Sequence, residues 1–220
     1  MSVIGSALPF FFGASKSSGP AIGAAYQGGF FAGYISHTAN GVATHALIVA
    51  PAATGATGTG YTLNTEKQWK TTNTTTAGTN SSFDGAANSA NMNDANHPAA
   101  QFCETLSIGG YTDWYLPARY ELDIAYENLK PTTDNNDTSW GINPYSVPER
   151  TANRTAGAPA QTSVAAFQTG GAEDFVADYH WSSTEVSATT ARKLGFTNGD
   201  QTITAKSSPG PVRAFRKLAL

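Results

Sequence analysis

Acidic and basic side chains gather in two short segments, so these are the first places to look for chemistry. Asp113 and Glu121 lie on either side of Arg119, and Arg213 and Arg216 follow near the C-terminus. Two carboxylates at one site could act as a general acid and a general base. A carboxylate among apolar residues can instead be structural, because a buried charge must be paired or hydrogen-bonded. We interpret both carboxylates as scaffold residues that pair with one of the three arginines, and we predict that the protein is not an enzyme and has no catalytic residue.

Other residue types that support catalysis or metal binding lack the spacing that those functions need. Ser182 and Ser183 are adjacent, but no strand–turn–helix elbow surrounds them as a nucleophile would require. The single cysteine, Cys103, excludes an intramolecular disulfide. No two histidines are spaced like zinc ligands. The four histidines are His37, His45, His97 and His180. We therefore predict no metal site and no cofactor.

The composition argues against nucleic acid as a partner and indicates contact with other protein chains. The formal net charge is only −3, and the sequence has no basic stripe. Within residues 1–65 a single charged side chain occurs, Lys16. Interfaces between permanently associated subunits are depleted in charge in the same way. We expect this region to pack against other chains; the alternative is an ordinary core hairpin preceded by a flexible start.

Residues 1–27 are rich in Gly, Ser, Ala and Pro and predict an extended arm. Phe10, Phe11 and Phe12 would be its assembly anchor. The apolar segment 3–12 is too short to span a bilayer. No basic residue precedes it, as one would in a signal peptide. We expect the arm to attach the protein to other proteins and not to insert into a membrane.

The remaining sequence predicts strands with two helices. Apolar segments 29–36 and 43–50 flank a turn signal and predict a β-hairpin. Helices are expected from Pro98 and from Pro117, because proline suits the first turn of a helix. Polar segments without periodicity predict long loops over 71–96 and 131–171. Four further strands are expected near the C-terminus, at 179–183, 192–196, 201–205 and 212–218, with a turn at Asn198-Gly199.

Three segments in this order resemble the motifs of one domain family. They are GGYTDWYLPARYEL at 109–122, YHWSSTE at 179–185 and VRAFR at 212–216. The domain is found at the ends of bacterial collagen-like adhesins and in bacteriophage structural proteins, and its fold is a variant of the C-type lectin fold. The resemblance implies an α+β fold: a C-type-lectin-like domain over 28–220, including the 28–50 hairpin, with a twisted antiparallel sheet, two helices and long loops.

Within those segments the resemblance assigns structural roles, and the chain departs from two better-known branches of the wider fold. The formylglycine-generating oxidases use paired cysteines, and calcium-dependent lectins use Glu-Pro-Asn or Gln-Pro-Asp with Trp-Asn-Asp; neither set occurs here. The expected structural residues are Asp113, Trp114, Leu116, Pro117, Glu121, Leu122, Trp181, Ser182, Arg213 and Arg216.

The resemblance also implies a function. We expect a bacteriophage virion structural protein, a tail-fibre or tail-tip subunit that is a homotrimer, binds other virion proteins through its arm and presents the lectin-like domain to a host cell-surface glycan or protein. The alternatives are a capsid decoration protein or head fibre, and a bacterial surface adhesin. Binding residues tend to lie in long loops. Trp140, Tyr145 and Phe167 are therefore the candidate receptor-contact aromatics, although they could instead pin the loops to the domain.

Overall fold

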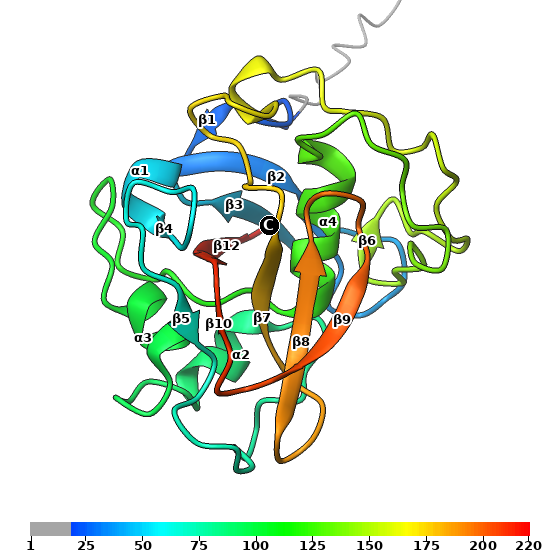
Figure 1. Ribbon diagram of the computed structural model, residues 1–220. Coiled ribbons are helices and arrows are strands. Elements are labelled where there is room, and N and C mark those ends of the chain that lie inside the picture. The colour runs from blue at the N-terminus through cyan, green and yellow to red at the C-terminus, as the bar shows by residue number, and fades with distance from the viewer. Residues whose placement is uncertain (1–18) are drawn as a thin grey trace, which may run out of the picture.

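A computed structural model of the chain describes residues 19–220 (Figure 1). The proposed anchor, Phe10 to Phe12, lies outside the described residues. The described chain is mixed, with mostly antiparallel sheets and few helices, so the predicted α+β class is confirmed. No helix between residues 19 and 220 is long and apolar enough to cross a membrane.

The largest sheet joins the two ends of the described chain. Its strand order is β1 (Ala25–Tyr26), β2 (Gly29–Ile35), β3 (His45–Val49) and β12 (Phe215–Ala219), and β6 (Ser146–Val147) pairs with β2. The predicted hairpin is therefore present as β2 and β3. Ala46 to Val49 are all buried, as a short continuous apolar run predicts.

Burial of this hairpin corrects the interpretation of its low charge. Phe31, Ile35 and Leu47 are buried by other parts of the same chain. Ile35 and Leu47 belong to the core cluster that also contains residues of helix 119–129. Contact with a second chain is not needed to explain why residues 29–50 carry no charge. Strand β1 lies in the segment assigned to the arm and pairs with β2.

Helix α4 (Arg119–Leu129) covers one face of this sheet (Figure 1). Its apolar residues recur at helical spacing, as predicted, and face the core; they include Leu122, Ala125, Tyr126 and Leu129. Close approach depends on Gly33, which has φ of 136° at a bulge in β2. A Cβ there would lie 2.9 Å from Ile124 and 2.6 Å from Asn128, so a larger residue would push the helix away.

Three further helices and one helical turn are short. They are α1 (Ala52–Gly55), α2 (Gly85–Ala90), α3 (Pro98–Glu104) and the 3-10 turn η1 (Ala165–Phe167). Helix α3 begins with Pro98 as expected and buries Cys103. Helix α2 was not expected, because 71–96 was predicted to be a loop. Asp84 caps it by accepting a hydrogen bond from the backbone N–H of Ala87.

A second sheet carries the C-terminal strands. Its order is β7 (Tyr179–Glu185), β8 (Thr190–Gly195) and β9 (Gln201–Ala205). The turn between β8 and β9 contains Asn198-Gly199 as predicted, and Gly199 has φ of 77°. Two further pairs of short antiparallel strands lie outside these two sheets. They pair β4 (Ala56–Thr57) with β11 (Val212–Arg213), and β5 (Lys67–Gln68) with β10 (Pro209–Gly210).

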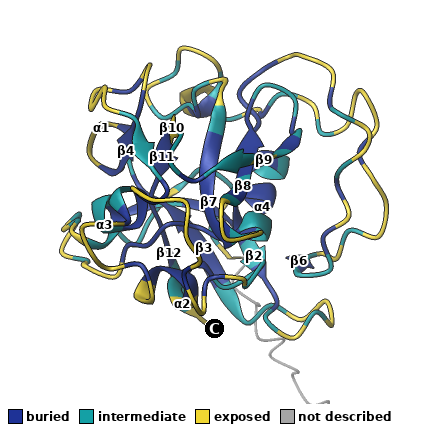
Figure 2. Cartoon of the chain, turned by 60° about the horizontal axis from the view of Figure 1, so that its bottom comes forward, coloured by how far each residue is buried: buried dark blue, intermediate teal, exposed yellow. Residues whose placement is uncertain are grey.

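The core contains the residues that the motifs indicated. Trp114, Leu116, Leu122 and Trp181 are each at most 2% exposed, which confirms their predicted burial. Leu122 lies in a cluster between α4 and the large sheet, whereas the other three lie in a second cluster with α3. Figure 2 shows that burial is concentrated in the central strands and that exposure is concentrated in the connecting loops.

Candidate functional site

The pairing expected for Asp113 is present. Its carboxylate accepts two hydrogen bonds from the guanidinium of Arg216, at 2.7 and 3.0 Å. Arg216 also donates to the carbonyl of Gln27 and lies 3.8 Å from the ring centre of Tyr111. One arginine thereby holds the last strand, the turn before β2 and the 111–113 segment together, which is a scaffold role.

The pairing expected for Glu121 is wrong. Within the described part of the chain, its carboxylate contacts no arginine. It accepts hydrogen bonds from the backbone N–H groups of Ala118 and Gly85, at 2.7 and 3.1 Å, and from the hydroxyl of Tyr115, at 2.7 Å. Burial raises the pKa of Glu121 to about 7, although the hydrogen bonds act in the opposite direction. This side chain joins the start of α4 to α2 through backbone groups that sequence spacing does not reveal.

The other motif residues also connect remote segments. Arg213 is fully buried, donates to the carbonyl of Ala50 at 2.7 Å and pairs with Glu173 at 3.0 Å. Ser182 donates through its hydroxyl to the carbonyl of Arg192 at 3.0 Å. The indole of Trp181 donates to the carbonyl of Lys67 at 3.0 Å. Each of these groups bonds a group of another segment, so they support the fold.

Sequence reasoning missed a charged network that anchors the long loop. Asp123 and Glu127 on α4 pair with Arg150 and Arg154 of the loop. Arg154 is 6% exposed and also donates to the carbonyl of Gly199 at 3.1 Å. The i, i+4 spacing of the two acids was a usable signal, because it places both on one face of a helix.

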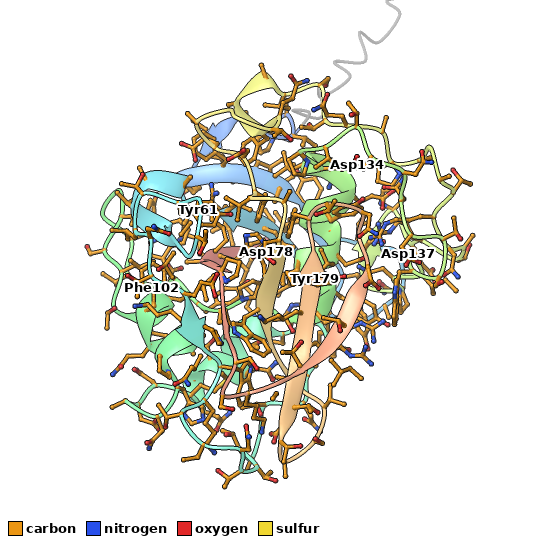
Figure 3. The ribbon with its side chains drawn as sticks, in the orientation of Figure 1. Tyr61, Phe102, Asp134, Asp137, Asp178 and Tyr179 are labelled. Carbon is orange, nitrogen blue, oxygen red and sulfur yellow. The ribbon has the colours of Figure 1, made fainter. Side chains whose placement is uncertain are left out.

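Among the candidate receptor-contact aromatics, Trp140 is held at the surface of this loop. Its indole N–H donates to Asp200 Oδ1 at 3.0 Å, and the hydroxyl of Tyr179 donates to the other carboxylate oxygen at 2.7 Å. Figure 3 labels Tyr179 on β7 and Asp137 in the loop outside β8 and β9. The N–H edge of the Trp140 indole is thus fixed by Asp200, while the Trp140 side chain remains partly exposed.

Two arginines flank the Trp140 ring. The guanidinium carbons of Arg119 and Arg192 lie 5.6 and 5.8 Å from its centre. Neither guanidinium has a carboxylate partner or a hydrogen bond between residues 19 and 220, and Arg119 Nε is buried without a partner. Burial, and then the charge of Arg119, lowers the pKa of Arg192. These two like charges are therefore close enough to repel each other.

A hollow of about 330 Å³ opens beside these groups. Ile142, which is 51% exposed, contributes an apolar wall. Ser139 and Asn153 contribute a hydroxyl and an amide. The Trp140 surface, as we call it, comprises four residues that line this hollow together with Arg192, which lies beside the Trp140 ring. The four are Arg119, Tyr120, Trp140 and Ile142.

The other two candidate aromatics differ from Trp140. Tyr145 stacks on Phe83 with ring centres 4.3 Å apart and an interplanar angle of 12°, and it lies 5.5 Å from Tyr120. These contacts favour the alternative in which Tyr145 pins its loop. Phe167 is 0% exposed and packs edge-on against Phe30. The expectation that Phe167 contacts a receptor is wrong, because its ring closes the core beneath η1.

Neither a metal centre nor a known relative defines the site further. From residue 19 onward, no group of three or more His, Cys, Asp and Glu side chains is arranged to hold a metal ion. The Trp140 surface instead offers cations, an aromatic ring and hydrogen-bonding groups, which suit non-covalent binding. No protein-family model matches the sequence, and no curated protein is significantly similar to it.

Proposed function

We propose that this chain is a bacteriophage virion structural protein, a tail-fibre or tail-tip subunit whose C-type-lectin-like domain recognises the host surface. The observation that carries the proposal is the Trp140 surface, in which a partly exposed indole lies between two arginines that have no acidic partner among residues 19–220. Arginine and tryptophan are both enriched among the residues that carry most of the binding energy at interfaces.

The arrangement of elements supports the lectin-like part of the proposal. The first strands and the last strand of the domain pair in one sheet, and a helix covers that sheet. A long, mostly irregular segment, 130–178, then separates α4 from the second sheet. Figure 1 shows much of this segment outside α4, and its short strand β6 pairs with β2 at the edge of the large sheet. Such an arrangement gives a rigid base to a loop that is free to vary in sequence.

The long loop, 130–178, is held in place by contacts with the rest of the domain, as a recognition loop needs to be. Its charged anchors, Arg150 and Arg154, are bound to acids on α4, and Asn136 donates to loop carbonyls. A loop that is already fixed loses little conformational entropy when it binds. The Trp140 surface is thus prepared for binding before a ligand arrives.

The test is adsorption of phage particles that carry Trp140→Ala. We expect adsorption to host cells to fall while particle yield stays constant, because the change removes an exposed ring and one edge hydrogen bond. The matched control is Phe102→Ala, another partly exposed aromatic, which belongs to α3 and lies on the opposite side of the view in Figure 3 from Asp137. Adsorption of the control should be unchanged.

Two outcomes would contradict the proposal. Equal adsorption by wild-type and Trp140→Ala particles would remove the Trp140 surface from host recognition. Unchanged adsorption together with less stable particles would favour the alternative of a capsid decoration protein. Immunogold labelling of intact particles would separate tail from head in the same preparation.

A further inference from the structure

The two arginines of the Trp140 surface hold positive charge that the fold does not neutralise. The four remaining arginines each pair with a carboxylate. Arg119 and Arg192 instead flank one indole, near enough for each other's charge to matter. Repulsion between them destabilises the free surface, so an anion placed between or beside them would relieve it.

The carboxylate nearest to the tryptophan edge is already engaged. Asp200 accepts the indole N–H of Trp140 through one oxygen and the hydroxyl of Tyr179 through the other. Asp137 likewise accepts the backbone N–H of Ser139 at 2.7 Å. These acids accept hydrogen bonds from neutral donors, and neither pairs with a guanidinium group among the described residues.

The surroundings of the arginines suit a sugar ring. Trp140 lines the hollow and offers the partly exposed part of its indole to the C–H groups of a pyranose, because an aromatic side chain combines apolar area with little rotamer freedom. The hollow beside it has a hydroxyl from Ser139 and an amide from Asn153, which can bond sugar hydroxyls. A guanidinium binds carboxylate or phosphate oxygens through two parallel hydrogen bonds.

We propose that the Trp140 surface binds an acidic glycan, a sugar ring that carries a carboxylate or a phosphate group. In this arrangement Trp140 contacts the ring, and Arg119 and Arg192 bind its anionic group. The inference rests on the proposed function, in that it assigns a chemical class to the surface polymer that the domain would recognise. Polyanions such as nucleic acids are poorer candidates, because the chain has a net charge of −3.

The test measures binding of the purified chain to trigalacturonate, mannose 6-phosphate and neutral maltotriose. Indole N–H signals in an NMR titration report on the tryptophans directly. We expect one of the two acidic probes to bind more tightly than maltotriose, and the acidic probe that binds identifies the anionic group. Binding should weaken with added salt, because exposed charges are screened.

Variants assign the binding to the surface. Arg119→Gln with Arg192→Gln should weaken binding of the acidic probe roughly tenfold or more, since a hydrogen bond between charged groups is lost for each arginine. The matched control is Lys67→Gln, which also removes positive charge and lies on β5, away from the loop. This control should bind within roughly twofold of wild type.

Failure of this inference is distinguishable from failure of the proposed function. Equal binding of acidic and neutral sugars, binding of neither, or equal losses in the double variant and in Lys67→Gln would overturn the acidic-glycan assignment. Particles with the double glutamine variant are then tested for adsorption. If they adsorb normally while Trp140→Ala particles do not, host recognition by this surface stands and the acidic ligand is rejected.

Discussion

The arginines of this protein divide into a paired and an unpaired set. Arg150, Arg154, Arg213 and Arg216 each contact an acidic side chain and connect segments that are far apart in the sequence. Arg119 and Arg192 lie over aromatic rings, and neither pairs with an acidic side chain among the described residues. The same side chain therefore stabilises the fold in one region and leaves a site for an external anion in the other.

Position in a motif does not separate the two sets. Arg119 lies in the first motif and Arg216 in the third, so sequence alone treats them alike. What separates them is the presence of an acid within reach, which depends on how the loop folds back over β8. The comparison predicts that substitutions of paired arginines cost stability, whereas substitutions of unpaired ones cost binding.

The largest expected effect is at Arg213. Arg213→Ala removes a fully buried guanidinium that bonds Ala50 and Glu173, and it leaves a buried carbonyl and a carboxylate without their donor. Breaking such a pair costs about 3–5 kcal/mol of unfolding free energy. Urea unfolding followed by tryptophan fluorescence measures it. Arg119→Ala is the matched control, and it should cost about 1 kcal/mol or less, because it breaks no ion pair and loses contacts with the rings of Tyr120 and Trp140; similar costs for both would erase the distinction between the sets.

Glu121 extends the comparison to an acidic side chain that has no arginine partner among the described residues. Burial raises its folded-state pKa from 4.5 to about 7, so the folded protein binds more protons than the unfolded chain between these values. Stability from this residue is therefore present at low pH and is lost as pH rises through that window. The expected loss is roughly 3 kcal/mol, because one pKa unit corresponds to about 1.4 kcal/mol.

Glu121→Gln should remove this loss. The amide oxygen can accept the two backbone N–H groups that Glu121 Oε2 accepts, and its NH₂ group can donate to Tyr115. Unfolding free energies of both proteins are compared at pH 4.5 and pH 8, so that other titrating groups cancel in the difference. A difference that does not change with pH would mean that Glu121 titrates normally.

Local sequence patterns were sufficient for much of the fold. The apolar run in β3, the helical spacing on α4 and the Asn198-Gly199 turn each depend on neighbours in the sequence, and each prediction was confirmed. Helix α2 was missed because its six residues, GAANSA, carry no apolar stripe. It is held by the Asp84 cap and by packing against β7, which sequence periodicity does not report.

The candidate site was predictable only in part. Trp140 was identified because it is an aromatic residue in a long polar loop, and Phe167 was selected on the same ground but is buried. The contribution of Arg119 and Arg192 could not be predicted, because they come from α4 and β8 and meet only at the loop. Absence of a partner is a property of the folded surroundings and has no local sequence signal.

A smaller effect is expected at Arg216, where the paired acid is partly in water. Arg216→Gln removes the contact with Asp113, whose side chain is 55% exposed, and the stacking on Tyr111. Exposed pairs contribute up to about 1 kcal/mol and cation–π contacts a similar amount, so a cost of about 1–2 kcal/mol is expected. Thermal unfolding at low and high salt measures it. Asp113→Asn should cost less, because it keeps the stacking; a larger cost for Asp113→Asn would make the ion pair the main contribution.

The smallest effect tests whether the unpaired set is electrostatically unfavourable. Arg192→Glu replaces a positive charge near Arg119 with a negative one, so repulsion becomes attraction at the same half-buried strand position. We expect a gain of a few tenths of a kcal/mol in unfolding free energy, the usual size for a partly exposed pair. Arg192→Gln, which removes only the repulsion, should give a smaller gain.

Salt separates this electrostatic gain from a change in packing. The gain from Arg192→Glu should shrink as ionic strength rises, because the charges are screened over about 10 Å at 0.1 M salt. A loss of stability, or a gain that salt does not reduce, would show that Arg192 already has a favourable interaction and belongs with the paired set. The same variant should lose the acidic glycan, because the surface then presents a carboxylate to an anion. Stability and binding would thus change in opposite directions at Arg192, whereas at Arg213 the principal change is in stability.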